Sequence, residues 1–80
     1  MIRIYADFNS SDEQGRVMLN TVGSLRDIEQ HKNVITEGMK VVLYMPGDFE
    51  VSGTLVFEGI WKGIPDWGTI LYENPEDTPK

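Results

Sequence analysis

Hydrophobic residues recur at every second position along two neighbouring stretches of this chain. The first, residues 39–45, reads MKVVLYM, and the second, residues 49–58, reads FEVSGTLVFE. Because successive side chains of a strand point to opposite faces, both stretches predict strands with one face against a core. Pro46 and Gly47 stand between them, and that pair favours a chain reversal. We therefore predict a hairpin whose second strand has a largely polar outer face.

The meander continues beyond this hairpin. Gly53 lies inside the second strand, where glycine indicates a bulge or a sharp bend of the kind that closes a small sheet into a barrel. After a glycine turn, the chain enters a short strand at 60–62. Since Pro65 cannot donate a backbone hydrogen bond, we expect residues 63–67 to form one tight turn, such as a 3₁₀ turn, before a last strand at 69–72.

The first half of the chain predicts two further strands and one helix. Residues 2–8 alternate, and we expect residues 16–20 to pair with them as a hairpin across a polar loop. Ser24 is a residue type that caps helices, and Asp27 follows three positions later. This weak capping box predicts a helix of two turns at 25–31.

These elements, with one more brief strand at 34–36, predict a mainly β protein. We expect a small barrel of five to six strands, with one short helix inserted after the first hairpin. Residues 1–72 would form this single β-barrel domain. Residues 73–80, ENPEDTPK, contain prolines and acids but no apolar anchor, so we expect a disordered acidic tail.

Composition excludes several function classes. There is no cysteine, so disulfides, thiolate nucleophiles and zinc–thiolate sites are ruled out. The net charge is −6 and the basic residues are scattered singly, so we expect no binding to nucleic acid or to an anionic membrane. No apolar run is long enough to span a membrane, and the N-terminal sequence MIRIYADF lacks the layout of a signal peptide. We therefore expect a cytoplasmic protein.

The polar residues assemble no catalytic or metal-binding motif. An EF-hand loop begun at Asp7 would need glycine at its sixth position and glutamate at its twelfth, where this chain has Asp12 and Met18. His31, the one histidine, lies at the expected helix end, which suits a surface or capping role. A catalytic carboxylate would need a desolvating pocket, for which an 80-residue barrel has little volume. We expect no cofactor, no metal and no enzyme activity.

Eight aromatic side chains remain as candidates for function: Tyr5, Phe8, Tyr44, Phe49, Phe57, Trp61, Trp67 and Tyr72. Phe8 and Phe57 fall on apolar strand faces and are expected in the core.

The proposed partner-binding residues are Tyr5, Tyr44, Trp61, Pro65 and Trp67. The two tyrosines lie on strand faces opposite the apolar residues, and the two tryptophans flank Pro65. Large amphipathic rings outside a core commonly anchor interfaces. The alternative interpretation is that both tryptophans plug the open ends of the barrel.

Three short segments resemble SH3 domains and the wider group of SH3-like barrels. Residues 4–8, IYADF, are similar to the first-strand motif, and residues 37–42, EGMKVV, to the second strand. Residues 63–70, GIPDWGTI, resemble the closing segment, in which a proline and an aromatic residue straddle a 3₁₀ turn. The resemblance implies a five-stranded barrel.

The same resemblance implies a shallow aromatic groove formed by Tyr5, Phe8, Pro65 and Trp67. The chain departs from the SH3 pattern where those domains carry a ligand-binding tryptophan pair, because it has Glu50-Val51 there. The long segment 9–36, with its helix, is also foreign to the standard loop. These departures argue against binding of proline-rich peptides.

Two hypotheses of function follow. The first is a non-catalytic interaction module that docks one protein partner through the Tyr5, Trp61 and Trp67 region, or that dimerises through an exposed strand edge. The alternative is a sensor for a small molecule or an anionic ligand, which predicts a concave apolar pocket lined by Trp61 and Trp67. A hydrolase would require two carboxylates in a buried cleft.

Overall fold

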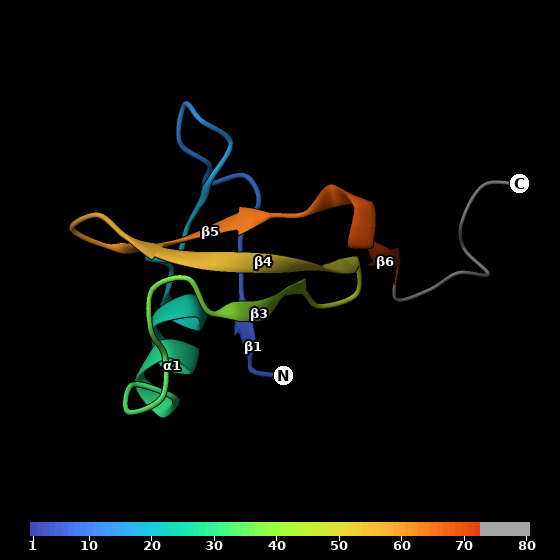
Figure 1. Cartoon of the computed structure of the whole chain (residues 1–80). Helices are drawn as coiled ribbons and strands as arrows, with labels where there is room; N and C mark the ends of the chain where they lie inside the picture. Colours follow the sequence, from blue (N-terminus) through green and yellow to red (C-terminus); the bar gives the residue numbers. More distant parts are fainter. Residues whose placement is uncertain (73–80) are drawn as a thin grey trace, which may run out of the picture.

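One curled sheet of six strands forms the body of the protein in a computed structural model that describes residues 1–72 (Figure 1). In chain order the elements are β1 (Arg3–Tyr5), β2 (Val17–Met18), α1 (Val22–Gln30), β3 (Lys40–Met45), β4 (Phe49–Phe57), β5 (Trp61–Pro65), the 3₁₀ turn η1 (Trp67–Thr69) and β6 (Leu71–Tyr72). The sheet order is β1-β3-β4-β5-β2, and β6 pairs with β4.

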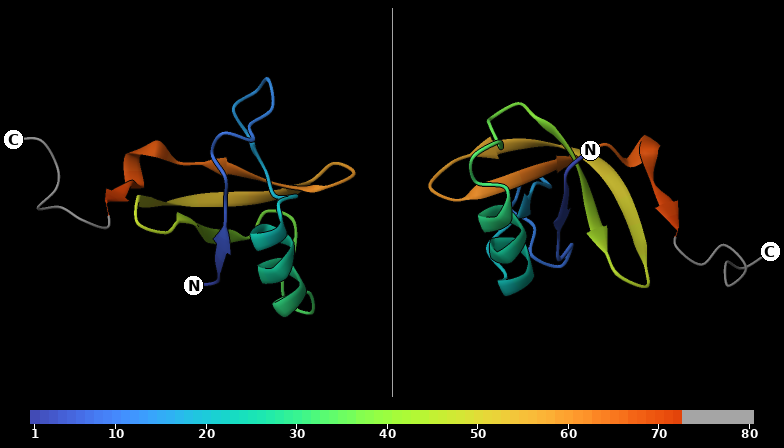
Figure 2. Two further views of the ribbon diagram at one scale, coloured as in Figure 1. Left: turned by 180° about the vertical axis from the view of Figure 1, so that it is seen from behind. Right: turned by 90° about the horizontal axis from the view of Figure 1, so that it is seen from below.

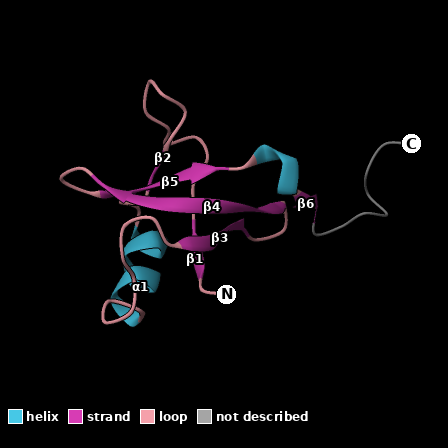
Figure 3. Cartoon of the chain, viewed as in Figure 1, coloured by secondary structure: helices cyan, strands magenta, loops and turns pink. Residues whose placement is uncertain are grey.

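The sheet curls into a half-barrel, and α1 lies beside β1 (Figure 2). More of the described residues lie in strands than in helices (Figure 3). The mainly β fold with one short helix is thus confirmed. The expected acidic tail at 73–80 lies outside the described residues.

The core is built from the alternating positions that the sequence indicates. Its buried side chains come from β1 to β4 and the segments beside them: Ile4, Ala6, Val17, Leu19, Ile35, Val41, Leu43, Val51 and Leu55. Phe8, expected in the core, packs against it but is only partly buried. The prediction for Phe57 is wrong, because its side chain is 49% exposed. β3 pairs with β4 only as far as Thr54, so the last residues of β4, including Phe57, extend beyond the end of β3.

Gly53 provides close packing and no bulge. The pairing register of β4 with β3 and β5 continues without interruption through this residue. A Cβ added at Gly53 would lie 2.5 Å from Leu43 Cδ1, and one added at Gly63 would lie 2.8 Å from the same atom. The two glycines therefore make room for Leu43, which is fully buried.

β1 does not form the predicted hairpin with residues 16–20. It pairs in parallel with β3, with Ile4 opposite Leu43, while β2 pairs with β5. A turn closed by the Ser10 N–H and the Asp7 carbonyl separates the two segments, at 2.9 Å. A hairpin forms further along the chain instead, where Ser11 makes an antiparallel backbone bridge with Val17.

The helix begins three residues before the predicted start. Its N-cap is Thr21, whose hydroxyl oxygen accepts a hydrogen bond from the Ser24 N–H. His31 is the C-cap, in agreement with a capping role. The brief strand expected at 34–36 is absent, because the N–H groups of Val34 and Ile35 donate to the His31 carbonyl and close a turn after the helix.

Two side chains of α1 cover the free edge of β1. The Tyr5 N–H donates to Asp27 Oδ2 at 2.8 Å, and Ser24 Oγ donates to the Tyr5 carbonyl oxygen. These bonds take the place of those that a further strand would make. At Tyr5, this sheet edge is therefore closed to pairing with another chain.

β5 extends further than predicted, through Pro65. The Asp66 N–H donates to the Ser52 carbonyl, and backbone groups alternate in direction along a strand, so the nitrogen of Pro65 points away from β4. A proline is accommodated at such a position because no ladder bond is lost. The 3₁₀ turn consequently lies after the proline, at Trp67–Thr69, and β6 is shorter than the expected strand.

Candidate interaction surface

The structure does not bring the five predicted partner-binding residues together. Tyr5 and Tyr44 meet edge to face, with ring centroids 6.0 Å apart, on the neighbouring strands β1 and β3. Trp61 packs against Phe57, 5.2 Å away. Trp67 lies in a different cluster, and Pro65 ends β5 between the two tryptophans.

The tyrosines have structural contacts. Tyr44 OH donates to Asp27 Oδ2 at 2.8 Å, and the Arg3 guanidinium lies 4.8 Å from the centroid of the Tyr44 ring. The hydrogen bond to Asp27, together with burial, raises the pKa of Tyr44. Gly23 of α1 lies so close to the Tyr5 ring that an added Cβ would be 2.9 Å from Cδ1. Both rings therefore join α1 to the sheet.

Four aromatic rings form the largest cluster, which we name the aromatic ledge: Phe8, Phe49, Trp67 and Tyr72. The Phe8 ring centroid is 4.8 Å from that of Phe49 and 5.4 Å from that of Trp67. Phe49 is in turn 6.0 Å from Trp67 and 6.3 Å from Tyr72. The rings come from four separate segments, which meet where η1 and β6 lie beside the start of β4 (Figure 1).

The ledge is supported on one side and exposed on the other. Phe8 and Phe49 pack against the core, whereas Trp67 is 52% exposed and Tyr72 55%. Leu71 is 63% exposed but pairs with Glu50, so it lies on the opposite face of β6 from Tyr72. The centroid distances show that the rings of the ledge pack directly on one another.

Hydrogen bonds hold Trp67 in place from both ends of η1. Asp66 caps the turn, with its Oδ1 accepting from the Gly68 N–H at 3.2 Å. Thr69 Oγ1 accepts from the Ser52 N–H at 2.9 Å and so fastens the turn to β4. The position of the indole is therefore set by the fold.

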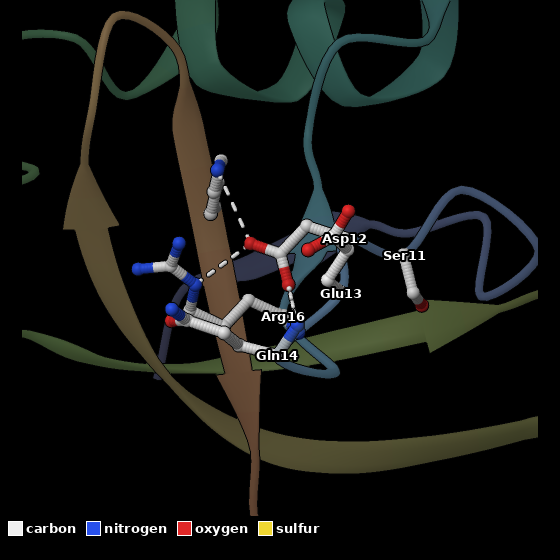
Figure 4. Close-up of a pocket in the computed structure, with 6 residues that line it drawn as sticks. Ser11, Asp12, Glu13, Gln14 and Arg16 are labelled. Atoms are coloured by element: carbon white, nitrogen blue, oxygen red, sulfur yellow. Dashed lines mark hydrogen bonds and ion pairs between the residues drawn. The ribbon is translucent and has the colours of Figure 1, made fainter.

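A separate polar depression of about 410 Å³ lies beside the hairpin loop (Figure 4). Its lining residues are Ser11, Asp12, Glu13, Gln14, Arg16 and Lys62. Neither tryptophan contributes to it. Arg16 donates from Nε to Asp12 Oδ2 at 2.8 Å, and Lys62 Nζ donates to the same oxygen at 3.1 Å.

Glu58 completes this ion-pair network. It accepts two hydrogen bonds from the Arg16 guanidinium, at 2.9 and 2.8 Å, and lies 3.6 Å from Lys62 Nζ. Both cations are thus matched by carboxylates, so the depression offers no unpaired positive charge to an anionic ligand. The network instead fastens the hairpin loop to β5.

The carboxylates of the network are kept ionised. Burial alone would raise the pKa of Asp12, but hydrogen bonds from Arg16, Lys62 and the Gln14 N–H outweigh it and hold that pKa well below its usual range. Arg16, followed by Lys62, lowers the pKa of Glu58. A general acid needs a raised pKa, so this carboxylate pair does not supply one.

Acid is expected to loosen the network. Since both folded-state pKa values are lowered, the carboxylates stabilise the fold above unfolded-state values of about 4, and this stabilisation is lost as the pH falls through the folded-state values. Urea denaturation at decreasing pH should show a smaller loss of unfolding free energy for Asp12→Asn than for the wild type. Glu13→Gln, in the same loop, is the matched control. An unchanged pH dependence in Asp12→Asn would contradict the assignment.

Within residues 1–72 no group of three or more histidine, cysteine or acidic residues is placed to hold a metal ion. The same part of the chain contains no helix that is long and apolar enough to cross a membrane.

Sequence reasoning missed Phe49 and Tyr72 as members of the ledge. A signal was present in the sequence, because Phe8, Phe49 and Trp67 each follow an aspartate directly. The fold gathers these three aspartate–aromatic pairs at one end of the sheet.

Comparison with known proteins gives one distant relative. A glandular kallikrein of Sus scrofa is 30% identical over 67 residues, a match that covers 78% of this chain and 27% of the kallikrein. The chain thus spans about a quarter of that protein's length. No family model matches the chain, and no solved structure matches it. We therefore interpret the ledge from its own geometry.

Proposed function

We propose that this protein is a non-catalytic protein–protein interaction module that docks a partner through the aromatic ledge. The observation that carries the proposal is the half-exposed surface of Trp67 and Tyr72, which rests on rings packed against the core. Large rings that are fixed beneath and exposed above are the usual anchors of interfaces, because they bury much area at little cost in side-chain entropy.

The polar groups support the non-catalytic part of the proposal. Ser24 is fully buried and donates its hydroxyl proton to the Tyr5 carbonyl oxygen, so it is no exposed nucleophile. The carboxylates of Asp12 and Glu58 are held ionised by their cations. Two rings of the ledge, Trp67 and Tyr72, leave about half of their surface exposed.

Loss of one ring should abolish docking while the fold persists. The full chain, Trp67→Ala and Phe57→Ala are used as baits in extracts of the source cells, and the captured proteins are quantified by mass spectrometry. Phe57 is a matched control, because it is an aromatic residue of similar exposure, 49%, outside the ledge. We expect Trp67→Ala to lose at least one protein that Phe57→Ala and the wild type retain.

Two further results complete this test. Cooperative thermal unfolding of both variants establishes that each is folded. Tyr72→Ser, at a 55% exposed position of the ledge, removes apolar docking area without disturbing the buried core and should lose the same protein. Identical captured sets for the wild type, Trp67→Ala and Tyr72→Ser would exclude the ledge as the docking surface.

A further inference from the structure

The ledge is bordered by three aspartates. Asp7, Asp48 and Asp66 directly precede Phe8, Phe49 and Trp67 in the sequence. Consecutive Cα atoms are about 3.8 Å apart, so the contacts among the three rings also bring the backbones of the three aspartates next to the ledge. Asp48 and Asp66 are exposed, and Asp7 is partly so.

None of these aspartates is in an ion pair with another residue of the part that the structure describes. Asp7 Oδ1 accepts from the Asn9 N–H at 2.9 Å, and Asp66 Oδ1 accepts from the Gly68 N–H, so these carboxylates bond to backbone groups that carry no charge. The ion pairs of the described residues involve other acids: Asp12, Glu29, Glu50 and Glu58. Within residues 1–72, the negative charge beside the ledge is therefore not compensated by an ion pair.

We infer that the ledge binds an arginine-bearing segment of the partner protein. This inference rests on the proposed docking function and adds the chemistry of the partner. A negative border around aromatic faces attracts cations twice over, through the carboxylates and through the ring quadrupoles.

Ring spacing selects arginine over lysine. Contacting rings of the ledge have centroids 4.8 to 6.3 Å apart, so they pack on one another and do not form a cage that would enclose an ammonium group. A guanidinium is planar and weakly hydrated, so it stacks on an exposed ring such as Trp67 while its edge donates two hydrogen bonds to a carboxylate such as Asp66. A lysine ammonium would have to give up more hydration for a single point contact.

The same charges disfavour a second copy of this chain on the ledge. Face-to-face contact between two ledges would place aspartates against aspartates, in a protein whose net charge is already −6. A nucleic acid would be repelled by the same border.

Matched peptides test the inference. Short glycine–serine peptides carrying two arginines, two lysines or two glutamines are titrated into the full chain at low salt, and the NMR signals of the two indole N–H groups are followed. We expect the arginine peptide to shift the Trp67 signal and leave that of Trp61 in place, with an affinity about tenfold above that of the lysine peptide. Added salt should weaken the binding.

Variants separate the two attractive contributions. Asp66→Asn keeps a capping side chain for η1 but removes the charge, and together with Asp48→Asn it should weaken arginine-peptide binding about threefold to tenfold. Glu13→Gln removes one charge in the hairpin loop, at a residue that does not adjoin a ledge ring in the sequence, and should have little effect. Trp67→Ala should abolish binding.

Equal affinity for arginine and lysine peptides, unchanged affinity of the double aspartate variant, or no binding of the arginine peptide would each overturn the inference. The docking proposal is judged separately, by whether Trp67→Ala loses its captured protein. Dimerisation of the wild type that Tyr72→Ser abolishes, seen in sedimentation velocity, would assign the ledge to a second copy and also overturn it.

Discussion

Replacing Leu43 by alanine is expected to lower the free energy of unfolding by about 2–5 kcal/mol, the largest single effect that we predict. Leu43 is fully buried on β3, and its side chain fills the space that Gly53 and Gly63 leave open. An alanine would leave a cavity that rigid strands on either side cannot close. Because a domain of this size is only marginally stable, the loss should be a large fraction of the total.

The measurement is urea denaturation followed by far-UV circular dichroism. Ile64→Ala, at a 42% exposed position on β5, is the matched control and should cost much less. If Leu43→Ala cost no more than Ile64→Ala, Leu43 would not be a main element of the core.

A double-mutant cycle tests the contact itself. Gly53→Ala alone should cost about 1–3 kcal/mol, because the new Cβ would overlap with Leu43 Cδ1. In the Leu43→Ala background the same change should cost far less, since the space has been vacated. Additive costs would show that Gly53 is required for a reason other than Leu43.

Replacing Asp27 by alanine is expected to cost about 2–4 kcal/mol, the second largest effect. The Asp27 carboxylate accepts from the Tyr5 N–H and from Tyr44 OH, both at 2.8 Å, and both donors would lose their acceptor. The change would also remove one of the two side chains that cover the β1 edge, so the variant should self-associate at high concentration.

Asp27→Asn and Tyr44→Phe are the controls for this effect. Asparagine retains an acceptor oxygen, and Tyr44→Phe removes one donor together with its need for an acceptor, so each should cost less than Asp27→Ala. Stability is measured by urea denaturation and self-association by sedimentation velocity. A cost for Asp27→Ala that is no greater than that for Tyr44→Phe would show that the bond from Tyr5 contributes nothing.

Local patterns were sufficient to predict the hairpin of β3 and β4. Alternation placed Val41, Leu43, Val51 and Leu55 on the inner face, and a proline–glycine turn set their pairing. The neighbour of β1 could not be read in this way. A strand of three residues, Arg3–Tyr5, carries no local signal for a parallel partner some forty positions away, because that pairing depends on the path of the intervening chain.

Competition between similar residues explains the shifted helix start. Thr21 and Ser24 are both capping types, and the sequence alone favoured Ser24. Its hydroxyl is instead needed at the edge of β1, where it donates to the Tyr5 carbonyl oxygen. Pro65 was misread for a related reason, because its effect on a strand depends on whether its nitrogen faces the neighbouring strand.

The candidate surface was predicted only in part. Trp67 was proposed from the sequence and lies in the ledge, whereas Tyr5 and Tyr44 join α1 to the sheet. How exposed a side chain is depends on which other segments pack against it in the folded protein. The alternation of residues within one strand does not predict those contacts. The three aspartate–aromatic pairs would have been a better guide, because they mark rings with charge beside them at positions where strands end.

Site-specific photo-cross-linking in the source cells tests the docking surface most directly. A photoreactive phenylalanine analogue is placed at Tyr72 on the ledge, or at Val22 on α1, which is 74% exposed and serves as the control. We predict a discrete adduct with another protein from position 72 that position 22 does not give. The same adducts from both positions, or an adduct from position 22 alone, would contradict docking at the ledge.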